Sequence, residues 1–327
     1  MLEQYSFPRH RPGETLHPGV ETLFQQLGVA DAIANAHFIR HRGHWVQWNR
    51  GRLFQAFGHD ASGDWRGFQI PRPILDKLLL ERASALGVVA LQPCRAREVI
   101  LHNHRVVGVH CDVGNLLSRH LIDASGGHAW LSRQLGLARQ AFSPPLIARY
   151  GYAQGVRPGG LDEPELVADR DGWYWTARLG HDLHHWTRLC FPQTSVLRMV
   201  PPPWFELLQA SGPIRGADVT WRLCSEPAGE GYVVVGDAAS VLDPAASHGV
   251  LKALMSGIMA AHAVLEEASR PLNQEDIWMQ YRQWMQDGFR RDLVNMHELY
   301  RVHPFARKCL PSSHHRRHAF GYFPYAM

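Results

Sequence analysis

Two adjoining stretches in the last third of the chain have the composition of a cofactor-binding strand and turn. Residues 231–239 read Gly-Tyr-Val-Val-Val-Gly-Asp-Ala-Ala, a β-branched run typical of a buried parallel strand that ends at Gly236 and Asp237. Residues 242–250 read Leu-Asp-Pro-Ala-Ala-Ser-His-Gly-Val, a stiff turn that leads into a helix of small residues. Because a helix N-terminus carries unpaired N–H groups and partial positive charge, we expect this turn to face an anion or a ring that develops negative charge.

The elements that position these stretches are indicated by apolar spacing and by turn residues. Helices are predicted at residues 23–28, 74–86, 130–135, from about 249 onward, and 275–300. Short strands are predicted at residues 88–91, 97–101, 106–111, 120–122 and 232–235, and a longer β-rich region at 146–192. Residues 37–69 are rich in Trp, His and Arg and favour short strands or loops. The pattern is that of a mixed α/β protein.

Composition narrows the class of protein. The chain has 327 residues, 45% of them hydrophobic, which suits one large domain or two interleaved ones. The formal charge of +4 is spread along the chain, so we expect neither a nucleic-acid partner nor a membrane partner. Five cysteines without a C-x-x-C pair favour a cytoplasmic protein without a zinc site. The apolar run 250–265 contains Lys252 and His262 and is short for a membrane span.

The strand and turn at 231–250 resemble the second flavin fingerprint of the FAD-dependent aromatic hydroxylases, of the p-hydroxybenzoate hydroxylase type, and of the flavin-dependent tryptophan halogenases. That fingerprint is a strand, Gly-Asp, then Asp-Pro and a Gly-led helix. The Gly-Asp pair alone also ends many unrelated buried strands, whereas the full string is specific. The resemblance implies that FAD is the cofactor. It places these residues at the ribityl chain or beside the isoalloxazine ring: Gly236, Asp237, Pro244, Gly249 and Val250.

Three further segments match this family in order and spacing. Residues 11–16 resemble its Gly-Glu-x-Leu loop, 71–76 its arginine-to-aspartate element before a helix, and 121–127 its Asp-Ala-x-Gly turn. An ordinary basic turn and a surface arginine before a helix are the alternatives for the first two. The resemblance implies cofactor contacts for Arg11, Glu14, Arg72, Ala124 and Gly126.

One part of the family pattern is missing from this sequence. Family members begin with a strand, a Gly-x-Gly-x-x-Gly turn and a helix that hold the FAD pyrophosphate, and no such turn occurs here. Leu2 and Glu3 resemble the end of the following strand, which implies that Glu3 binds the adenosine ribose. A late start codon, a fragment and a natural loss remain open as explanations. Without the first strand, we expect exposed apolar edges, weak FAD binding and poor solubility.

The resemblance implies a mixed α/β fold in two interleaved domains. A truncated, Rossmann-like FAD-binding domain is predicted to take residues 1–36, 70–140 and 225–270. An antiparallel β-sheet substrate domain takes residues 37–69 and 141–224, and a C-terminal helical segment and tail take 271–327.

The residues that would set the chemistry match the halogenases only in part. The halogenase string Trp-x-Trp-x-Ile-Pro keeps both tryptophans here, as Trp173 and Trp175, without the Ile-Pro end. By alignment, Arg40 stands where halogenases have a lysine and Ala246 where they have a glutamate. Arginine stays protonated and does not readily form a haloamine. The sequence therefore favours monooxygenase-like hydroxylation, with halogenation as one alternative and a remnant without activity as another.

His248 is the candidate catalytic residue, as a proton shuttle beside the ring, and a helix-capping role is its alternative. Trp173 and Trp175 are candidates for contact with an aromatic substrate, or else core residues. The histidines at 181, 184 and 185 lack the spacing of a metal site. The expected substrate is an aromatic small molecule or a residue of a partner protein. Electrons would come from NAD(P)H or from a separate flavin reductase.

Overall fold

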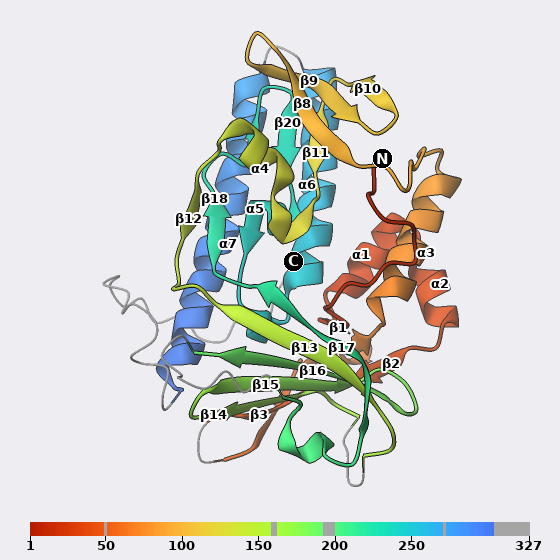
Figure 1. The fold of residues 1–327 in the computed structure, drawn as a ribbon, viewed down its shortest axis with the longest axis vertical. Coiled ribbons are helices and arrows are strands. Elements are labelled where there is room, and N and C mark those ends of the chain that lie inside the picture. The colour runs from red at the N-terminus through yellow and green to blue at the C-terminus, as the bar shows by residue number, and fades with distance from the viewer. Residues whose placement is uncertain (49–50, 158–161, 192–199, 271–272, 304–327) are drawn as a thin grey trace.

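The computed structural model describes residues 1–48, 51–157, 162–191, 200–270 and 273–303. Figure 1 shows three groups of elements: a large sheet, a group of small sheets and helices that includes α6 and α7, and a bundle of three short helices. Helix α7 runs from the second group down to the large sheet. The candidate functional residues lie where the three groups meet.

The large sheet has seven strands in the order β17-β13-β16-β15-β14-β3-β4. All its pairs are antiparallel except β14 with β3, which is parallel. Its strands are β3 (Gly43–Gln47), β4 (Leu53–Ala56), β13 (Ile147–Gln154), β14 (Glu165–Asp169), β15 (Gly172–Arg178), β16 (Leu183–Cys190) and β17 (Gln209–Asp218). These strands account for the β-rich region predicted at 146–192 and for part of 37–69.

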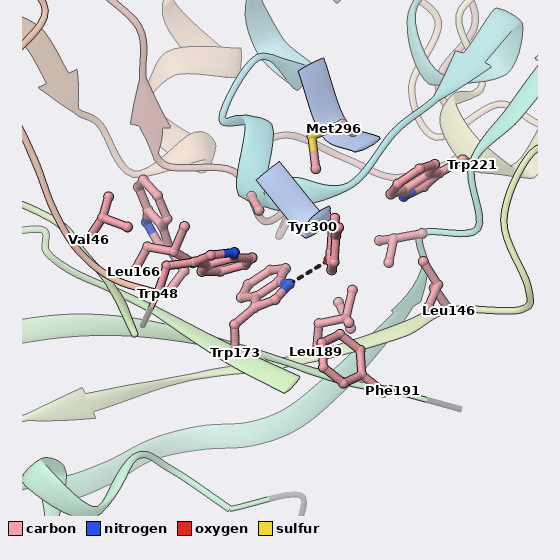
Figure 2. Packing of buried hydrophobic residues seen from close by; sticks show 14 residues of the cluster. Val46, Trp48, Leu146, Leu166, Trp173, Leu189, Phe191, Trp221, Met296 and Tyr300 are labelled. Atoms are coloured by element: carbon pink, nitrogen blue, oxygen red, sulfur yellow. Dashed lines mark hydrogen bonds between the residues drawn. The ribbon is translucent and has the colours of Figure 1, made fainter. Parts of the chain in front are cut away.

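An aromatic core covers one face of this sheet (Figure 2). Side chains alternate along a strand, so Trp173 and Trp175 of β15 point to this same face. Met296 and Tyr300 of α7 insert into the core beside Trp173 and Trp221. The indole N–H of Trp173 donates a hydrogen bond to the Tyr300 hydroxyl over 2.8 Å, the contact dashed in Figure 2.

The second group is built on a parallel pair of strands. β11 (Leu121–Asp123) lies beside β20 (Tyr232–Val234), with β19 (Ala228–Gly229) on the other side of β20. Its helices are α4 (Trp130–Leu135), α5 (Gly236–Ala239), α6 (Gly249–Ser269) and α7 (Gln274–Arg301). A second core of Val, Ala and aromatic residues joins α6 and the first half of α7 to β20. The predicted strand at 232–235 is present, and the Gly-Asp pair after it opens the single turn α5.

The third group packs α1 (Val20–Leu27), α2 (Ala30–Asn35) and α3 (Arg72–Ala85) around a third apolar core. A small sheet in the order β1-β7-β2 lies beside them, formed by β1 (Thr15–Leu16), β7 (Gly67–Gln69) and β2 (Ile39–His41). Helix α1 ends at Gly28, whose φ of 69° is the left-handed conformation that glycine adopts without strain. Gly28 was also the residue from which the sequence predicted the end of this helix.

The remaining elements are short. One sheet has the order β10-β9-β8, with β8 (Ala96–His102), β9 (Arg105–Cys111) and β10 (Gly114–Leu117). Another is formed by β12 (Arg139–Ala141), β18 (Arg222–Cys224) and β21 (Ser240–Val241). The other pieces are β5 (His59–Asp60), β6 (Gly63–Asp64), η1 (Gly126–His128), η2 (Pro203–Phe205) and η3 (Pro244–Ala246).

Two expectations about elements differ from the structure. The predicted strand at 88–91 is wrong, because only Leu91 forms a bridge, with Leu2, and Val89 is 71% exposed. Helix α6 is longer than the apolar run read from sequence, and by length and composition it could cross a membrane. In the structure it packs against α5 and α7. The expected lack of a membrane span therefore stays a prediction.

Gly231, just before β20, has a φ of 76° that an alanine would adopt only with strain. A Cβ there would also lie 2.0 Å from the Val106 carbonyl oxygen. We expect Gly231→Ala to lower the free energy of unfolding by at least about 2 kcal/mol in urea denaturation. Gly257→Ala on α6, where a Cβ meets open space, should instead raise it by roughly 0.5 to 1 kcal/mol. Equal effects of the two substitutions would contradict this account.

Candidate functional site

Asp237 lies at the start of α5, directly after strand β20. Its side chain is accessible to solvent, yet burial in the surrounding protein raises its pKa above the ordinary value. Desolvation of this carboxylate by the protein around it disfavours its charged form. Four cations counteract this rise: Arg72, Lys252, Arg139 and Arg11. We refer to these four residues as the cation cluster, and an anionic or strongly polar ligand beside Asp237 would lie in their field.

Arg72 joins two of the predicted cofactor segments. Its guanidinium donates from Nε to Asp76 over 2.9 Å and from Nη1 to the Pro12 carbonyl over 3.2 Å. A Cβ on Gly13 would lie 3.4 Å from Nη1 of Arg72 and 3.9 Å from Cγ2 of Val250. The loop around Gly13, the start of α3 and the turn before α6 therefore meet at one place. The cofactor contacts expected for these segments stay predictions.

Arg139 is a residue of the site that the sequence analysis missed. It donates to the Gly127 carbonyl over 3.4 Å and to the Asp237 carbonyl over 3.3 Å, so it links the two predicted turns. Its Nε is buried without a hydrogen-bond partner, and burial lowers the pKa of this arginine. No motif marks this position, because β12 is brought to the turns only by the tertiary fold.

The 123–127 turn leaves room for a ligand. Asp123 accepts hydrogen bonds from the backbone N–H groups of Ser125 and Leu131, each over 2.9 Å, and so fixes the turn. A Cβ on Gly126 or Gly127 would meet nothing within 4 Å. Open space, glycine backbone and the unpartnered Nε of Arg139 fit a phosphate-containing cofactor. Ala124 in the same turn is exposed.

Asp243 holds the turn that leads into α6. Its carboxylate accepts from the Ala245 backbone N–H over 2.9 Å and from the Tyr300 hydroxyl over 2.6 Å. Burial raises the pKa of Asp243 to about 6, against the effect of these hydrogen bonds. The turn ends at Gly249, which is exposed and faces open space at the N-terminus of α6. The turn is thus fixed by Asp243 and is open to solvent at Gly249.

Glu14 is almost completely buried and contacts protein groups. It accepts hydrogen bonds from the backbone N–H of Gly13 over 2.8 Å and from the Tyr152 hydroxyl, and His185 Nε2 lies 3.8 Å away. Its carboxylate therefore fixes the 11–16 loop on the large sheet. The cofactor contact expected for Glu14 stays a prediction, and the structure adds that both carboxylate oxygens already have partners in the protein.

Glu3 and Arg11 lie at the edge of this region. Glu3 pairs with Arg9 over 3.0 Å, and Arg9 lies 3.7 Å from Asp76, the partner of Arg72. Arg11 is exposed and belongs to the cation cluster. Their expected cofactor contacts stay predictions.

His248 lies at the predicted turn and belongs to a group of imidazoles, the histidine cluster: His17, His41, His44 and His248. The ring centroids of His17 and His248 are 5.1 Å apart, and His44 lies 5.6 Å from Trp175. Burial is the main cause that lowers the pKa of His17, His44 and His248 to about 4. At neutral pH His248 is therefore an uncharged group, which argues against proton donation from an imidazolium. Its side chain makes no capping hydrogen bond to α6.

The structure separates the two tryptophans that the sequence treated alike. Trp173 has no exposed surface and bonds to Tyr300, so the structure gives it the core role. Trp175 donates its indole N–H to Thr15 over 3.2 Å and contacts the ring of His44. Only Trp175 remains a candidate for substrate contact.

Arg40 lies outside the histidine cluster, whereas its neighbour His41 belongs to it. Arg40 pairs with Glu21 over 2.8 Å and stacks on the Phe68 ring at 3.8 Å. The positive charge of Lys252 contributes to the lowered pKa of His248, and the Lys252 ammonium group pairs with Asp292 over 2.5 Å. Ala246 packs against the aromatic core.

Within the described ranges, no group of three His, Cys, Asp or Glu residues is arranged to hold a metal ion.

No family model matches the chain, but individual proteins do. A 1H-pyrrole-2-carbonyl-[peptidyl-carrier protein] brominase of Pseudoalteromonas luteoviolacea is 26% identical, over 92% of this chain and 80% of its own length. A tryptophan 2-halogenase of Chondromyces crocatus is 25% identical, over 94% of this chain and 64% of its own length. The crystal structure of CmlS, a flavin-dependent halogenase, superposes with a TM-score of 0.84 at 21% identity, over 95% of this chain and 63% of CmlS.

These matches confirm the mixed α/β fold and the resemblance to flavin-dependent halogenases and related FAD-dependent enzymes. The relatives use a flavin, as the resemblance implied. They agree better with the halogenase alternative than with the hydroxylation that the sequence analysis favoured. The chain spans somewhat less than two thirds of the tryptophan 2-halogenase and of CmlS.

Proposed function

We propose that this chain is an FAD-dependent oxidoreductase that halogenates an electron-rich aromatic substrate. The observation that carries the proposal is a junction in the fold at the turn 244–249. Trp175 is joined to this turn through Thr15, and Lys252 of the following helix acts electrostatically on both His248 and Asp237. The chain that carries this junction resembles halogenases over more than nine tenths of its length. The substrate class comes from the printed activities of those relatives.

The residues present fit an FAD molecule. Asp237 and the cation cluster would hold the polar chain, the 123–127 turn has room for a phosphate group, and the turn before α6 would lie along the ring. FAD, when bound, supplies the oxidising chemistry that the side chains lack. The partial positive charge at the start of α6 would stabilise negative charge on a ligand placed there.

The chain's own contribution is to orient ligands and exclude water. Asp243 and Tyr300 fix the turn before α6, and Glu14 fixes the loop that faces it. The aromatic core of the large sheet closes one side of the junction against water. Fixed groups and a dry surface favour the attack of an activated oxidant on the substrate over its loss to solvent.

Hydroxylation is the second candidate function, and one observation favours it. Arg40 and Ala246 occupy the positions at which halogenases have a lysine and a glutamate, and Arg40 points to Glu21 instead of the histidine cluster. Mass spectrometry of products formed from indole with FAD, a flavin reductase, and chloride or bromide distinguishes the two. We expect a chlorine or bromine isotope pattern. Gain of one oxygen would establish the second candidate, and an FAD-loaded protein that forms neither product would overturn both.

Asp237→Ala tests the cofactor site directly. We expect FAD affinity, measured by flavin fluorescence titration, to fall about tenfold, since a charged hydrogen-bonding partner is removed. The FAD-free protein should unfold at the same urea concentration or a higher one, because a desolvated carboxylate is lost. Asp31→Ala, at an exposed residue at the start of α2, is the matched control and should leave FAD affinity unchanged. Unchanged FAD affinity in Asp237→Ala would contradict the assigned role.

A further inference from the structure

An open cavity of about 430 Å³ lies between helix α4 and the start of strand β8. Small-molecule sites have volumes of roughly 300 to 1,000 Å³, so the cavity is large enough for a ligand. Among the described residues that line it, none is acidic and three are arginines. The residues that matter here are Arg95, Arg97, His128, Trp130, Arg133 and Gln134. A lining of this kind attracts an anion.

Hydrogen bonds hold the two walls of this cavity in place. The Val99 N–H of β8 donates to the side chain of Gln134 over 3.3 Å, which joins α4 to β8. The backbone N–H of Trp130 donates to the Ser125 hydroxyl over 2.8 Å, which ties the start of α4 to the turn before it. The cavity therefore lies between elements whose relative position is fixed.

Two of the three arginines have no acidic partner. Arg97 donates from Nε to Asp112 over 2.7 Å, and Asp112 also accepts from the backbone N–H of Arg95 over 2.8 Å. Within the described residues, the guanidinium groups of Arg95 and Arg133 pair with no carboxylate, and Arg133 contacts the ring of His128. Burial and the charges of Arg133 and Arg95 lower the pKa of His128, so this imidazole adds no charge at neutral pH. The lining thus carries two unbalanced positive charges.

The charge of the cavity decides between classes of anion. The carboxylate of Asp123 counteracts the lowering of the His128 pKa, but Asp123 is buried and accepts from the N–H groups of Ser125 and Leu131. Neighbouring guanidinium groups repel one another, and a bound dianion would remove this repulsion. A phosphate monoester carries about −1.5 to −2 charges at pH 7, whereas a phosphate diester or a carboxylate carries a single negative charge. The monoester is therefore the better match.

We propose that this cavity binds the phosphate monoester of a small molecule, with Arg95 and Arg133 at the phosphate and Trp130 at the organic part. Arginine can donate two parallel N–H bonds to a phosphate, and an indole ring packs against a flat or apolar group. The inference is independent of the proposed function, because neither Asp237 nor the turn before α6 takes part. The 2′-phosphate of NADPH and the phosphate of another small metabolite are two sources of the same group.

Adenosine monophosphate and cyclic AMP test the charge selection, because they share a base and differ in the charge of the phosphate. Calorimetric titration at pH 7.5 should show the monoester binding at least about tenfold more tightly than the cyclic diester. We expect the same preference without FAD and with FAD in excess. Arg95→Gln and Arg133→Gln should each weaken AMP binding by roughly tenfold, since a charged partner is lost. Arg291→Gln, at an exposed arginine of α7, is the matched control and should leave AMP binding unchanged.

NADP⁺ and NAD⁺ distinguish the two sources, because they differ only in the 2′-phosphate. Tighter binding of NADP⁺ would identify NADPH as the source. Equal binding of the two dinucleotides, with AMP still preferred over cyclic AMP, would identify another phosphorylated small molecule. Both outcomes support the site.

Three results would overturn the inference. They are equal binding of AMP and cyclic AMP, unchanged AMP affinity in both arginine variants, and loss of AMP binding in excess FAD. The last result would mean that the cavity holds the adenylate half of FAD. Arg95 and Arg133 are exposed, so we expect both variants to fold, and the comparison of AMP with cyclic AMP on the wild type needs no variant.

Discussion

Acidification from pH 7 to pH 4 is expected to destabilise this protein by several kcal/mol. Burial lowers the pKa of His17, His44 and His248 from 6.5 to about 4, so each contributes stability that is complete above pH 6.5 and lost as the pH falls through 4. One pKa unit corresponds to ~1.4 kcal/mol, which gives each histidine at most about 3 kcal/mol. Partial exposure and mutual repulsion of the three reduce the sum to roughly 5 kcal/mol.

Two carboxyl groups act in the opposite direction, because burial raises the pKa of both Asp237 and Asp243. The pKa of Asp243 is raised to about 6, so its contribution to stability is present below its ordinary pKa of 3.8 and lost as the pH rises through 6. Asp243 offsets about 3 kcal/mol of the acid effect at most. Asp237 adds less, because its side chain is exposed to solvent. The three histidines outnumber these two groups, and the net direction remains destabilisation by acid.

Urea denaturation at several pH values between 4 and 7 measures this effect. The double variant His44→Gln with His248→Gln should show a clearly shallower loss of stability with falling pH, because two of the three half-buried bases no longer titrate. His59→Gln, at an exposed position, should keep the wild-type pH dependence. A double variant as acid-sensitive as the wild type would show that other groups control acid unfolding.

Replacing Tyr300 with phenylalanine is expected to lower the free energy of unfolding by about 2 to 4 kcal/mol. The Tyr300 hydroxyl donates to Asp243 over 2.6 Å and accepts from the Trp173 indole over 2.8 Å. Trp173 and Asp243 are 0% and 2% exposed, so water cannot replace the lost partner. Without this donor, the pKa of Asp243 should rise further, and the turn before α6 should lose its fixed position.

Tyr281→Phe is the matched control for this substitution. Tyr281 is also buried on α7, and its hydroxyl makes one hydrogen bond, to the Val234 carbonyl over 2.9 Å. Its loss should cost only about 1 kcal/mol. Urea denaturation compares the two variants, and FAD titration should show weaker binding only for Tyr300→Phe. Equal losses of stability and unchanged FAD affinity in both would refute the proposed coupling between α7 and the turn.

The parts of the site that follow from local sequence were predicted well. The strand at 232–235, the helix at 130–135 and the start of α6 at Gly249 are where β-branched runs, apolar spacing and glycine placed them. The turns at 124–127 and 236–237 lie close together because the strands before them, β11 and β20, are parallel neighbours, and Arg139 bonds to both turns. Local patterns sufficed here because each element is specified by neighbours along the chain.

The remaining features depend on residues distant in sequence. His17, His44 and His248 come together only through the fold, and no spacing could indicate them. Trp173 and Trp175 share one face of β15, so the alternation of side chains along the strand cannot show which of the two is buried against Tyr300. Glu14 resembled a cofactor contact, whereas its partners Tyr152 and His185 come from strands more than a hundred residues away.

The 28 residues of α7 form a rod of about 42 Å that spans two groups of elements. Its first half is embedded beside β20, and its last turns are embedded in the aromatic core of the large sheet. Hinge bending between these groups would have to extract Tyr300 and Met296 from that core, at a cost comparable to unfolding it. Under the proposed function, substrates would therefore enter through local movements of loops, and the two groups of elements would keep one fixed relative geometry during turnover.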